Sequence, residues 1–266
     1  MILAITPPLV ILFRYLPYAM NMSFPLDMGQ FKNVLFSTRI PGHEIDVIQK
    51  APENTRHVVV FYRGRAYSVN AFTESMLPRD PADILADLEA IEADGQARGF
   101  NEDPVCALTS TTRDVWATNR EHLIELGNAE ALDAVDHGMF ALCLDDFAYT
   151  GPDDCMKQHI AGKSQNRWPE KSFMVVMGHC GKAGVVFEHA WGDGAAVLHF
   201  MNSVNHHVTE INQGDFAGPP LAADTLKASS NGVLNEIKFK VCCFIQTGCY
   251  CDLRWMKRFP MKSKKQ

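Results

Sequence analysis

The sequence predicts an α/β fold, and two observations carry this prediction. Beyond Pro41 the chain alternates between short runs of β-branched and aromatic residues and longer segments whose apolar side chains have helical spacing. Several of the helical segments also begin and end with residues typical of helix termini. With 266 residues, of which 47% are hydrophobic and 21% charged, the chain can bury a large core and has a globular composition.

The first elements after residue 41 are a hairpin and a helix. "RHVVVFYRGRAYSV" contains two strand-like runs that meet at Arg63-Gly64, which predicts a turn there. Downstream, Asp80 is suited to cap a helix that begins with Pro81. We expect the apolar face of this helix to contain Ile84, Leu85, Leu88 and Ile91.

A second helix is predicted within "TSTTRDVWATNREHLIELGN". Thr111 and Asp114 have the spacing of a capping box, and Gly127-Asn128 is expected to end the helix. A short helical piece follows around Leu132 and Val135. Next, "MFALCLDD" reads as a buried strand, and residues 147–170 read as a polar loop.

The segment that follows is predicted to form strand, turn, strand and helix. The turn lies near residues 178–184, and His189 ends the second strand. Asp193 is placed to cap the helix, whose apolar face comprises Val197, Phe200, Met201, Val204 and Val208. Beyond it, residues 212–232 read as a linker and "VLNEIKFKV" as a further strand.

Several other motifs do not favour a site. "GHCGKAG" lacks the spacing of a phosphate-binding loop, no Gly-x-Ser-x-Gly elbow occurs, and Cys180 and His179 point apart as neighbours in a turn. Surface positions are expected for His199, His206 and His207. No metal is expected at the cluster Cys242, Cys243, Cys249 and Cys251, and reduced thiols are expected at Cys106, Cys143, Cys155 and Cys180.

The net charge and the start of the chain limit which partners and locations are expected. A net charge of -6 gives no reason to expect a nucleic acid. The apolar stretch up to Arg14 is too short to span a bilayer and contains Pro7-Pro8, and the start of the chain lacks the character of a transit peptide.

The stretch "HAWGDG" is the strongest candidate site. A histidine between a strand and a helix is held by backbone on both sides, and imidazole is suited to accept a proton from a thiol or an alcohol near neutral pH. We expect His189 to be catalytic, Asp193 to orient the loop, and Gly192 and Gly194 to permit close backbone approaches. The residues alone leave open a plain strand-end histidine beside a capping aspartate.

His189-x-x-x-Asp193-Gly194 is similar to the signature of CoA-dependent acyltransferases with the chloramphenicol acetyltransferase-like fold. With its surroundings, "NRWPEKSFMVVM" and "FEHAWGDGAAVLHFMN", it resembles the carnitine acyltransferase family, and within it the mitochondrial long-chain members. "FPLDMGQFKNVLFSTRIP", "ALTSTTRDVWATNRE" and "FALCLDDF" extend the resemblance from about residue 23 to about residue 208.

The resemblance implies a mixed sheet flanked by helices and a palmitoyl-type transferase that exchanges an acyl group between CoA and carnitine. It implies His189 as general base, acyl-CoA and carnitine as substrates, no bound cofactor, and a mitochondrial location on the matrix side of the inner membrane. Family members have two domains, and we expect only the first here, in residues 23–220. Residues 1–22 and 241–266 resemble nothing in the family. Residues 221–266 are expected to form a linker and a Cys-rich basic tail that is poorly ordered.

The expected loss of the second domain has a consequence for activity. Oxyanion stabilisation and substrate positioning usually contribute more than a general base, so we expect impaired turnover. An alternative from another class is a non-catalytic fragment that binds a partner chain or a membrane surface through an exposed apolar face and its basic tail.

Overall fold

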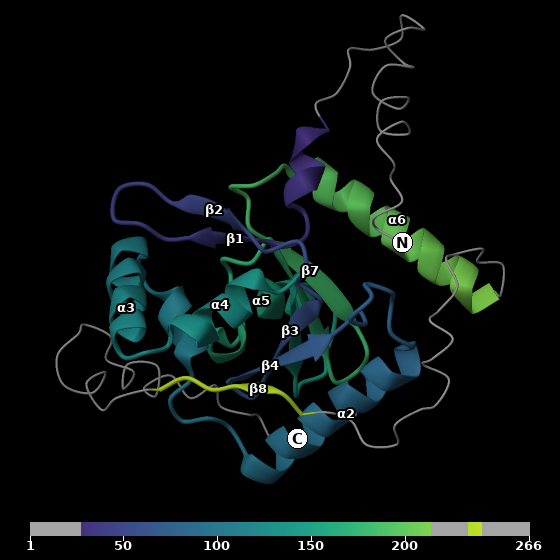
Figure 1. Cartoon of the computed structure of the whole chain (residues 1–266). Helices are drawn as coiled ribbons and strands as arrows, with labels where there is room; N and C mark the ends of the chain where they lie inside the picture. Colours follow the sequence, from purple (N-terminus) through teal and green to yellow (C-terminus); the bar gives the residue numbers. More distant parts are fainter. Residues whose placement is uncertain (1–27, 214–233, 241–266) are drawn as a thin grey trace, which may run out of the picture.

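The computed structural model describes residues 28–213 and 234–240, which form a mixed sheet with helices on both faces (Figure 1). The six strands lie in the order β7-β6-β5-β3-β4-β8. Their bounds are β3 (His57–Tyr62), β4 (Arg65–Asn70), β5 (Ala141–Asp145), β6 (Phe173–Gly178), β7 (Ala183–Phe187) and β8 (Glu236–Ile237). The three central strands β3, β5 and β6 run parallel, and the outer pairs are antiparallel. The predicted α/β fold with a mixed sheet is confirmed.

Five α-helices lie in the described ranges: α2 (Pro81–Arg98), α3 (Arg113–Glu125), α4 (Ala129–His137), α5 (Pro152–Ala161) and α6 (Gly194–Gln213). Short 3₁₀ turns are η2 (Gly29–Asn33), η3 (Val105–Ser110) and η4 (Ser164–Asn166), and a two-stranded sheet joins β1 (Ser37–Ile40) to β2 (Val47–Lys50).

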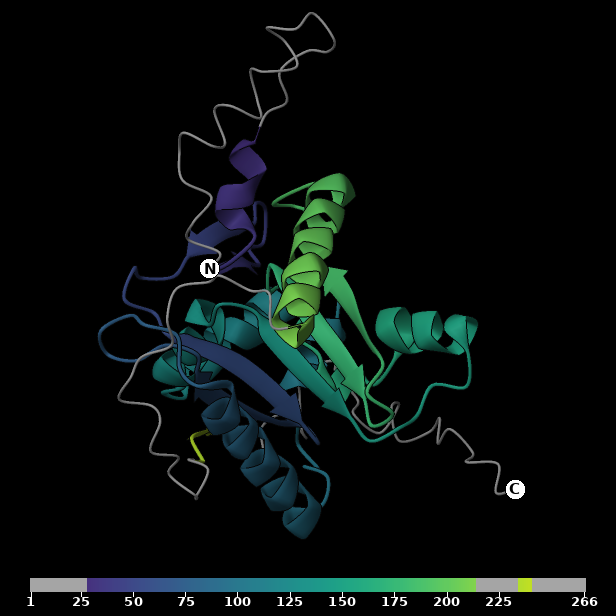
Figure 2. The ribbon, with the colours of Figure 1, turned by 90° about the vertical axis from the view of Figure 1, so that its right-hand side faces the viewer.

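Successive side chains of β3 point to opposite faces of the sheet, and their contacts show which helices cover each face. Val59 and Phe61 pack in one cluster with side chains of η3, α3 and α4, whereas Val60 packs with Ile91 of α2. A third cluster joins Val58 to Val197 of α6, on the same face as α2. Figure 2 shows α2 and α6 in front of the sheet.

The predicted hairpin and its following helix are confirmed. Arg63 and Gly64 both have positive φ, 48° and 75°, the pattern of a tight hairpin turn between β3 and β4. The carboxylate of Asp80 accepts a hydrogen bond from the amide of Ala82 at 2.8 Å and caps α2. One part of the predicted apolar face is wrong, because Leu85 is 55% exposed.

Two predictions between residues 109 and 170 are wrong. The N-cap of α3 is Thr112, and the Thr111 hydroxyl donates instead to the carbonyl of Leu108, so the predicted capping box does not form. The predicted polar loop contains α5, which begins at Pro152. The predicted end of α3 is confirmed, since Gly127 has φ of 84° and follows the last turn.

The β6-β7 hairpin and the helix after it are also confirmed, but β7 ends at Phe187, so the prediction that His189 ends this strand is wrong. In α6, Val197 is buried and Phe200 packs against Phe173, but Val208 is 47% exposed and does not belong to the apolar face. Predictions for residues 1–22 and for the cysteines beyond residue 241 fall outside the described residues. No helix in 28–213 or 234–240 combines the length and apolar character needed to cross a membrane.

Candidate functional site

His189 lies in the loop between β7 and α6, at an edge of the sheet. Its side chain is exposed, and its ring contacts Phe187, with ring centroids 5.4 Å apart and planes tilted by 33°. Within the part of the chain that the structure describes, no hydrogen bond or ion pair reaches the imidazole. Both ring nitrogens therefore face no competing group from these residues, which suits a proton acceptor.

The loop around His189 is fixed to the neighbouring strand by two hydrogen bonds to one carbonyl. The amide of Glu188 donates to the carbonyl oxygen of Ser172 at 3.0 Å, which extends the β6-β7 ladder by one residue. The indole nitrogen of Trp191 donates to the same oxygen at 2.6 Å. Trp191 is 5% exposed and packs with Val34 and Val197, so His189 lies between two anchored residues.

The side chain of Glu188 connects the loop to the first strand. One carboxylate oxygen accepts from the Arg39 guanidinium at 2.9 Å, and the other accepts from the amide of Ala190 at 3.0 Å. Arg39 also bonds Asp46 at 2.7 Å. Burial lowers the pKa of the Arg39 guanidinium, but the hydrogen bonds to Asp46 and Glu188 outweigh this, and the pKa is raised on balance.

Asp193 caps α6. Its carboxylate accepts from the amide of Ala195 at 2.7 Å, and its carbonyl accepts from the amide of Ala196 at 3.0 Å. Its own amide donates to the side-chain oxygen of Gln30 at 2.6 Å. The predicted N-cap is thus confirmed, and no hydrogen bond in the described ranges joins this carboxylate to His189.

Gly192 and Gly194 differ in how much room an added side chain would have. A Cβ atom at Gly192 would lie 3.2 Å from the side-chain oxygen of Gln30, so this position has little spare room. A Cβ atom at Gly194 would lie 3.6 Å from the Phe187 ring, an ordinary contact. Neither glycine has a φ in the left-handed region. The close approach predicted for both is therefore present only at Gly192.

A buried carboxyl group lies among the charges of this region. Glu170 is almost completely buried, and burial raises the pKa of its carboxyl to about 8, although nearby Arg39 acts in the opposite direction. Its backbone carbonyl accepts from the amide of Arg39 at 2.8 Å. The raised pKa favours the neutral carboxyl of Glu170, while the Arg39 guanidinium pairs with Asp46 and Glu188.

Other candidates from the sequence lie elsewhere. Residues 178–182 form the turn between β6 and β7, as predicted, and His199, His206 and His207 lie on the surface of α6. Cys106 and Cys143 are buried, Cys155 is half-buried and Cys180 is exposed; all four are free thiols. Among the described side chains, no group of three or more His, Cys, Asp or Glu residues has the arrangement of a metal site.

Sequence reasoning missed three residues that hold the loop: Gln30, Arg39 and Trp191. Gln30 and Arg39 lie 163 and 149 positions from their partners, and no spacing rule connects residues so far apart. Trp191 lies inside the motif, and its indole N–H was the one available signal, because a buried tryptophan normally finds an acceptor.

Comparisons with known proteins identify the family of the chain. Residues 12–249 match the model of the choline/carnitine O-acyltransferase family, a match that extends beyond residues 23–220 at both ends. The chain is 36% identical over 234 residues to mitochondrial carnitine O-palmitoyltransferase 2 of Mus musculus, covering 88% of this chain and 34% of that protein. The corresponding enzyme of Rattus norvegicus is 39% identical over 196 residues, covering 74% and 29%.

A more distant relative is the muscle isoform of carnitine O-palmitoyltransferase 1 from Bos taurus. It is 31% identical over 208 residues, covering 74% of this chain and 27% of its own length. The chain therefore spans about a third of the length of the curated relatives it matches. By the extent of the family match and the identity to these relatives, the chain belongs to the choline/carnitine O-acyltransferase family.

Proposed function

We propose that this chain contributes the general base of a long-chain carnitine O-acyltransferase, and that His189 is that base. The observation that carries the proposal is the pairing of an exposed imidazole, which has no described polar partner, with a loop that is anchored on both sides. Family membership supports acyl transfer, and the names of the relatives support palmitoyl groups and carnitine as substrates.

The proposed chemistry needs only one proton acceptor from this loop. The His189 ring takes the proton from the carnitine hydroxyl, whose oxygen attacks the acyl carbonyl of acyl-CoA. In the reverse direction, the ring takes the proton from the CoA thiol. Asp193 does not transfer protons in this scheme, because its carboxylate caps α6 and so fixes the end of the loop.

The turnover of the isolated 266-residue polypeptide is expected to be low. A general base contributes roughly a hundred- to ten-thousand-fold, whereas positioning and oxyanion stabilisation usually supply more. The chain spans about a third of the length of these relatives.

The test is an assay of the purified chain for palmitoylcarnitine formed from palmitoyl-CoA and carnitine. His189→Gln is expected to abolish whatever transfer the chain supports. The matched control is His206→Gln, which changes another exposed histidine and is expected to leave the rate unchanged. Equal rates in the wild type and His189→Gln would exclude His189 as the base.

A mitochondrial location is proposed from the names of the relatives, and attachment to the matrix side of the inner membrane is a finer proposal that rests on the family resemblance. Fractionation of cells that express the full-length tagged protein tests both. Release of the protein from mitochondrial membranes into the soluble fraction by carbonate would contradict tight membrane attachment.

A further inference from the structure

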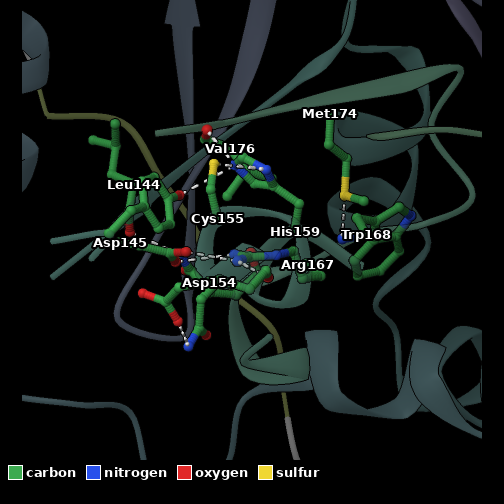
Figure 3. A network of polar contacts seen from close by, with 12 residues as sticks. Leu144, Asp145, Asp154, Cys155, His159, Arg167, Trp168, Met174 and Val176 are labelled. Atoms are coloured by element: carbon green, nitrogen blue, oxygen red, sulfur yellow. Dashed lines mark hydrogen bonds and ion pairs between the residues drawn. The ribbon is translucent and has the colours of Figure 1, made fainter. Parts of the chain in front are cut away.

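A second cluster of reactive side chains lies on α5, away from His189. The sulfur of Cys155 lies 3.5 Å from Nδ1 of His159, one helical turn along. Nε2 of His159 lies 3.2 Å from the carbonyl oxygen of Val176 in β6 (Figure 3). The Tyr149 hydroxyl lies 3.2 Å from the same nitrogen.

The carbonyl of Val176 favours the tautomer of His159 with its hydrogen on Nε2, because a carbonyl oxygen can only accept. In this tautomer the Tyr149 hydroxyl oxygen lies beside Nε2 as a second acceptor. Nδ1 then has a free lone pair and accepts the thiol proton of Cys155. A nucleophile, a base that accepts its proton and a third group that orients the base form the arrangement of an activated nucleophile.

The sheet holds this pair in place. A Cβ atom at Gly184 of β7 would lie 2.3 Å from the His159 ring, so the missing side chain is what lets the ring pack there. Arg167, buried in an ion pair with Asp145, also donates to the carbonyl of Gln158 at 3.3 Å and holds the end of α5. Figure 3 shows Arg167 and Cys155 close to His159.

The outer side of α5 adds an apolar surface next to the thiol. Met156 is 64% exposed and Ile160 is 76% exposed, and the two lie one turn apart in the row beside Cys155 and His159. Neighbouring exposed apolar side chains offer a surface to an alkyl chain, and an alkyl chain laid on this row would end beside the sulfur.

We propose that Cys155 is an S-acylation site that takes a long-chain acyl group from an acyl thioester. The thiol proton moves to Nδ1 of His159, and the sulfur attacks the thioester carbonyl. The new bond joins the Cys155 sulfur to the acyl carbon, the bond from that carbon to the donor sulfur breaks, and His159 returns the proton to the leaving thiolate. No oxidation or reduction occurs.

The donor is the same class of molecule that the proposed function assigns as substrate, and to that extent this inference rests on it. The two sites are nevertheless separable, since the acylation uses no residue of the His189 loop. His189→Gln is expected to retain acylation of Cys155 while losing transfer to carnitine, so failure of either proposal is seen independently of the other.

The experiment incubates the full 266-residue chain with palmitoyl-CoA and follows a hydroxylamine-sensitive mass increase on the peptide that contains Cys155. Cys180 is a demanding internal comparison, because it is exposed and hydrogen bonds from the backbone amides of Lys182 and Tyr149 lower the pKa of its thiol. If thiolate content alone governed acylation, Cys180 would be modified first. We expect Cys155 to be modified faster.

Substitutions of His159 and of the apolar pair test the two roles separately. His159→Gln can still donate from its amide to Val176 but cannot accept a proton as a base, and it is expected to slow acylation by about 100-fold or more. Met156→Ser with Ile160→Ser is expected to remove the preference for palmitoyl-CoA over acetyl-CoA. Acylation of Cys180 ahead of Cys155, or an unchanged rate in His159→Gln with a native circular dichroism spectrum, would overturn the proposal.

Discussion

The indole nitrogen of Trp191 and the carbonyl oxygen of Ser172 are joined by a 2.6 Å hydrogen bond, and that same oxygen accepts the amide of Glu188. One acceptor immediately before β6 therefore holds both a backbone hydrogen bond that continues the β6-β7 ladder and the far side of the loop that carries His189. The position of the exposed imidazole is set by this buried contact.

Trp191→Phe is expected to destabilise the protein more than Trp168→Phe does. Both changes remove similar volume from a buried site, but the indole nitrogen of Trp168 has no hydrogen-bond partner among the described residues. Only Trp191→Phe loses a hydrogen bond, which adds about 1 kcal/mol to its cost. Urea denaturation measures the difference, and equal costs would show that the bond to Ser172 contributes nothing net.

Asp193→Ala is expected to cost about 1 kcal/mol, because α6 loses its capping acceptor. Asp193→Asn keeps an oxygen in the same place and is expected to be close to wild type. Asp80→Ala, at the corresponding position of α2, provides the matched control. Thermal unfolding of the three variants tests this, and an Asn variant as unstable as the Ala variant would point to a role for the negative charge.

The stability of the protein is expected to depend on pH through Glu170. Burial raises the pKa of this carboxyl to about 8 from an ordinary value of 4.5, so the folded state binds the proton more tightly. Its contribution is full below pH 4.5, declines as the pH rises, and is lost above about pH 8; its size is on the order of a few kcal/mol. Denaturant titrations at pH 5, 6.5 and 8 should show a steeper decline for the wild type than for Glu170→Gln.

Gly95→Ala is expected to destabilise the protein although alanine is the better helix former. Alanine gains about 1 kcal/mol in helix propensity, but its Cβ atom would lie 2.4 Å from the Tyr62 ring, and overpacking of this kind costs about 1–3 kcal/mol. Gly194→Ala is the control, because its Cβ atom has ordinary room beside Phe187. Chemical denaturation that finds Gly95→Ala more stable than wild type would mean that Tyr62 moves aside at little cost.

The sequence predicted those elements whose signals are local. Asp80 and Pro81 mark the start of α2, and Arg63-Gly64 marks a turn, because capping and left-handed backbone depend on neighbours only. Helix α5 was missed since none of its side chains is buried, so no apolar period reveals it. Leu85 and Val208 follow the helical period, yet they are 55% and 47% exposed. Ile84 and Leu88 pack against the cluster around Val60, so Leu85 lies outside the face of α2 that the sheet covers.

The features of the candidate site likewise separate into those that the local sequence predicts and those that it does not. The position of His189 after a strand and the capping role of Asp193 follow from residues close in sequence. The contacts of Gln30 and Arg39 with the loop depend on how distant segments pack, which no local pattern encodes. The pair formed by Cys155 and His159 was also missed, because its helix was not predicted.

The distance along the chain between the loop and its supports has a consequence for synthesis. Gln30 and Arg39 leave the ribosome 163 and 149 residues before the partners they bind. Closing contacts over such separations costs chain entropy, which is compensated only when the intervening strands have assembled. A nascent chain therefore carries these two residues without their partners in the loop until residues 188–193 have been made, and the imidazole reaches its final position only after that.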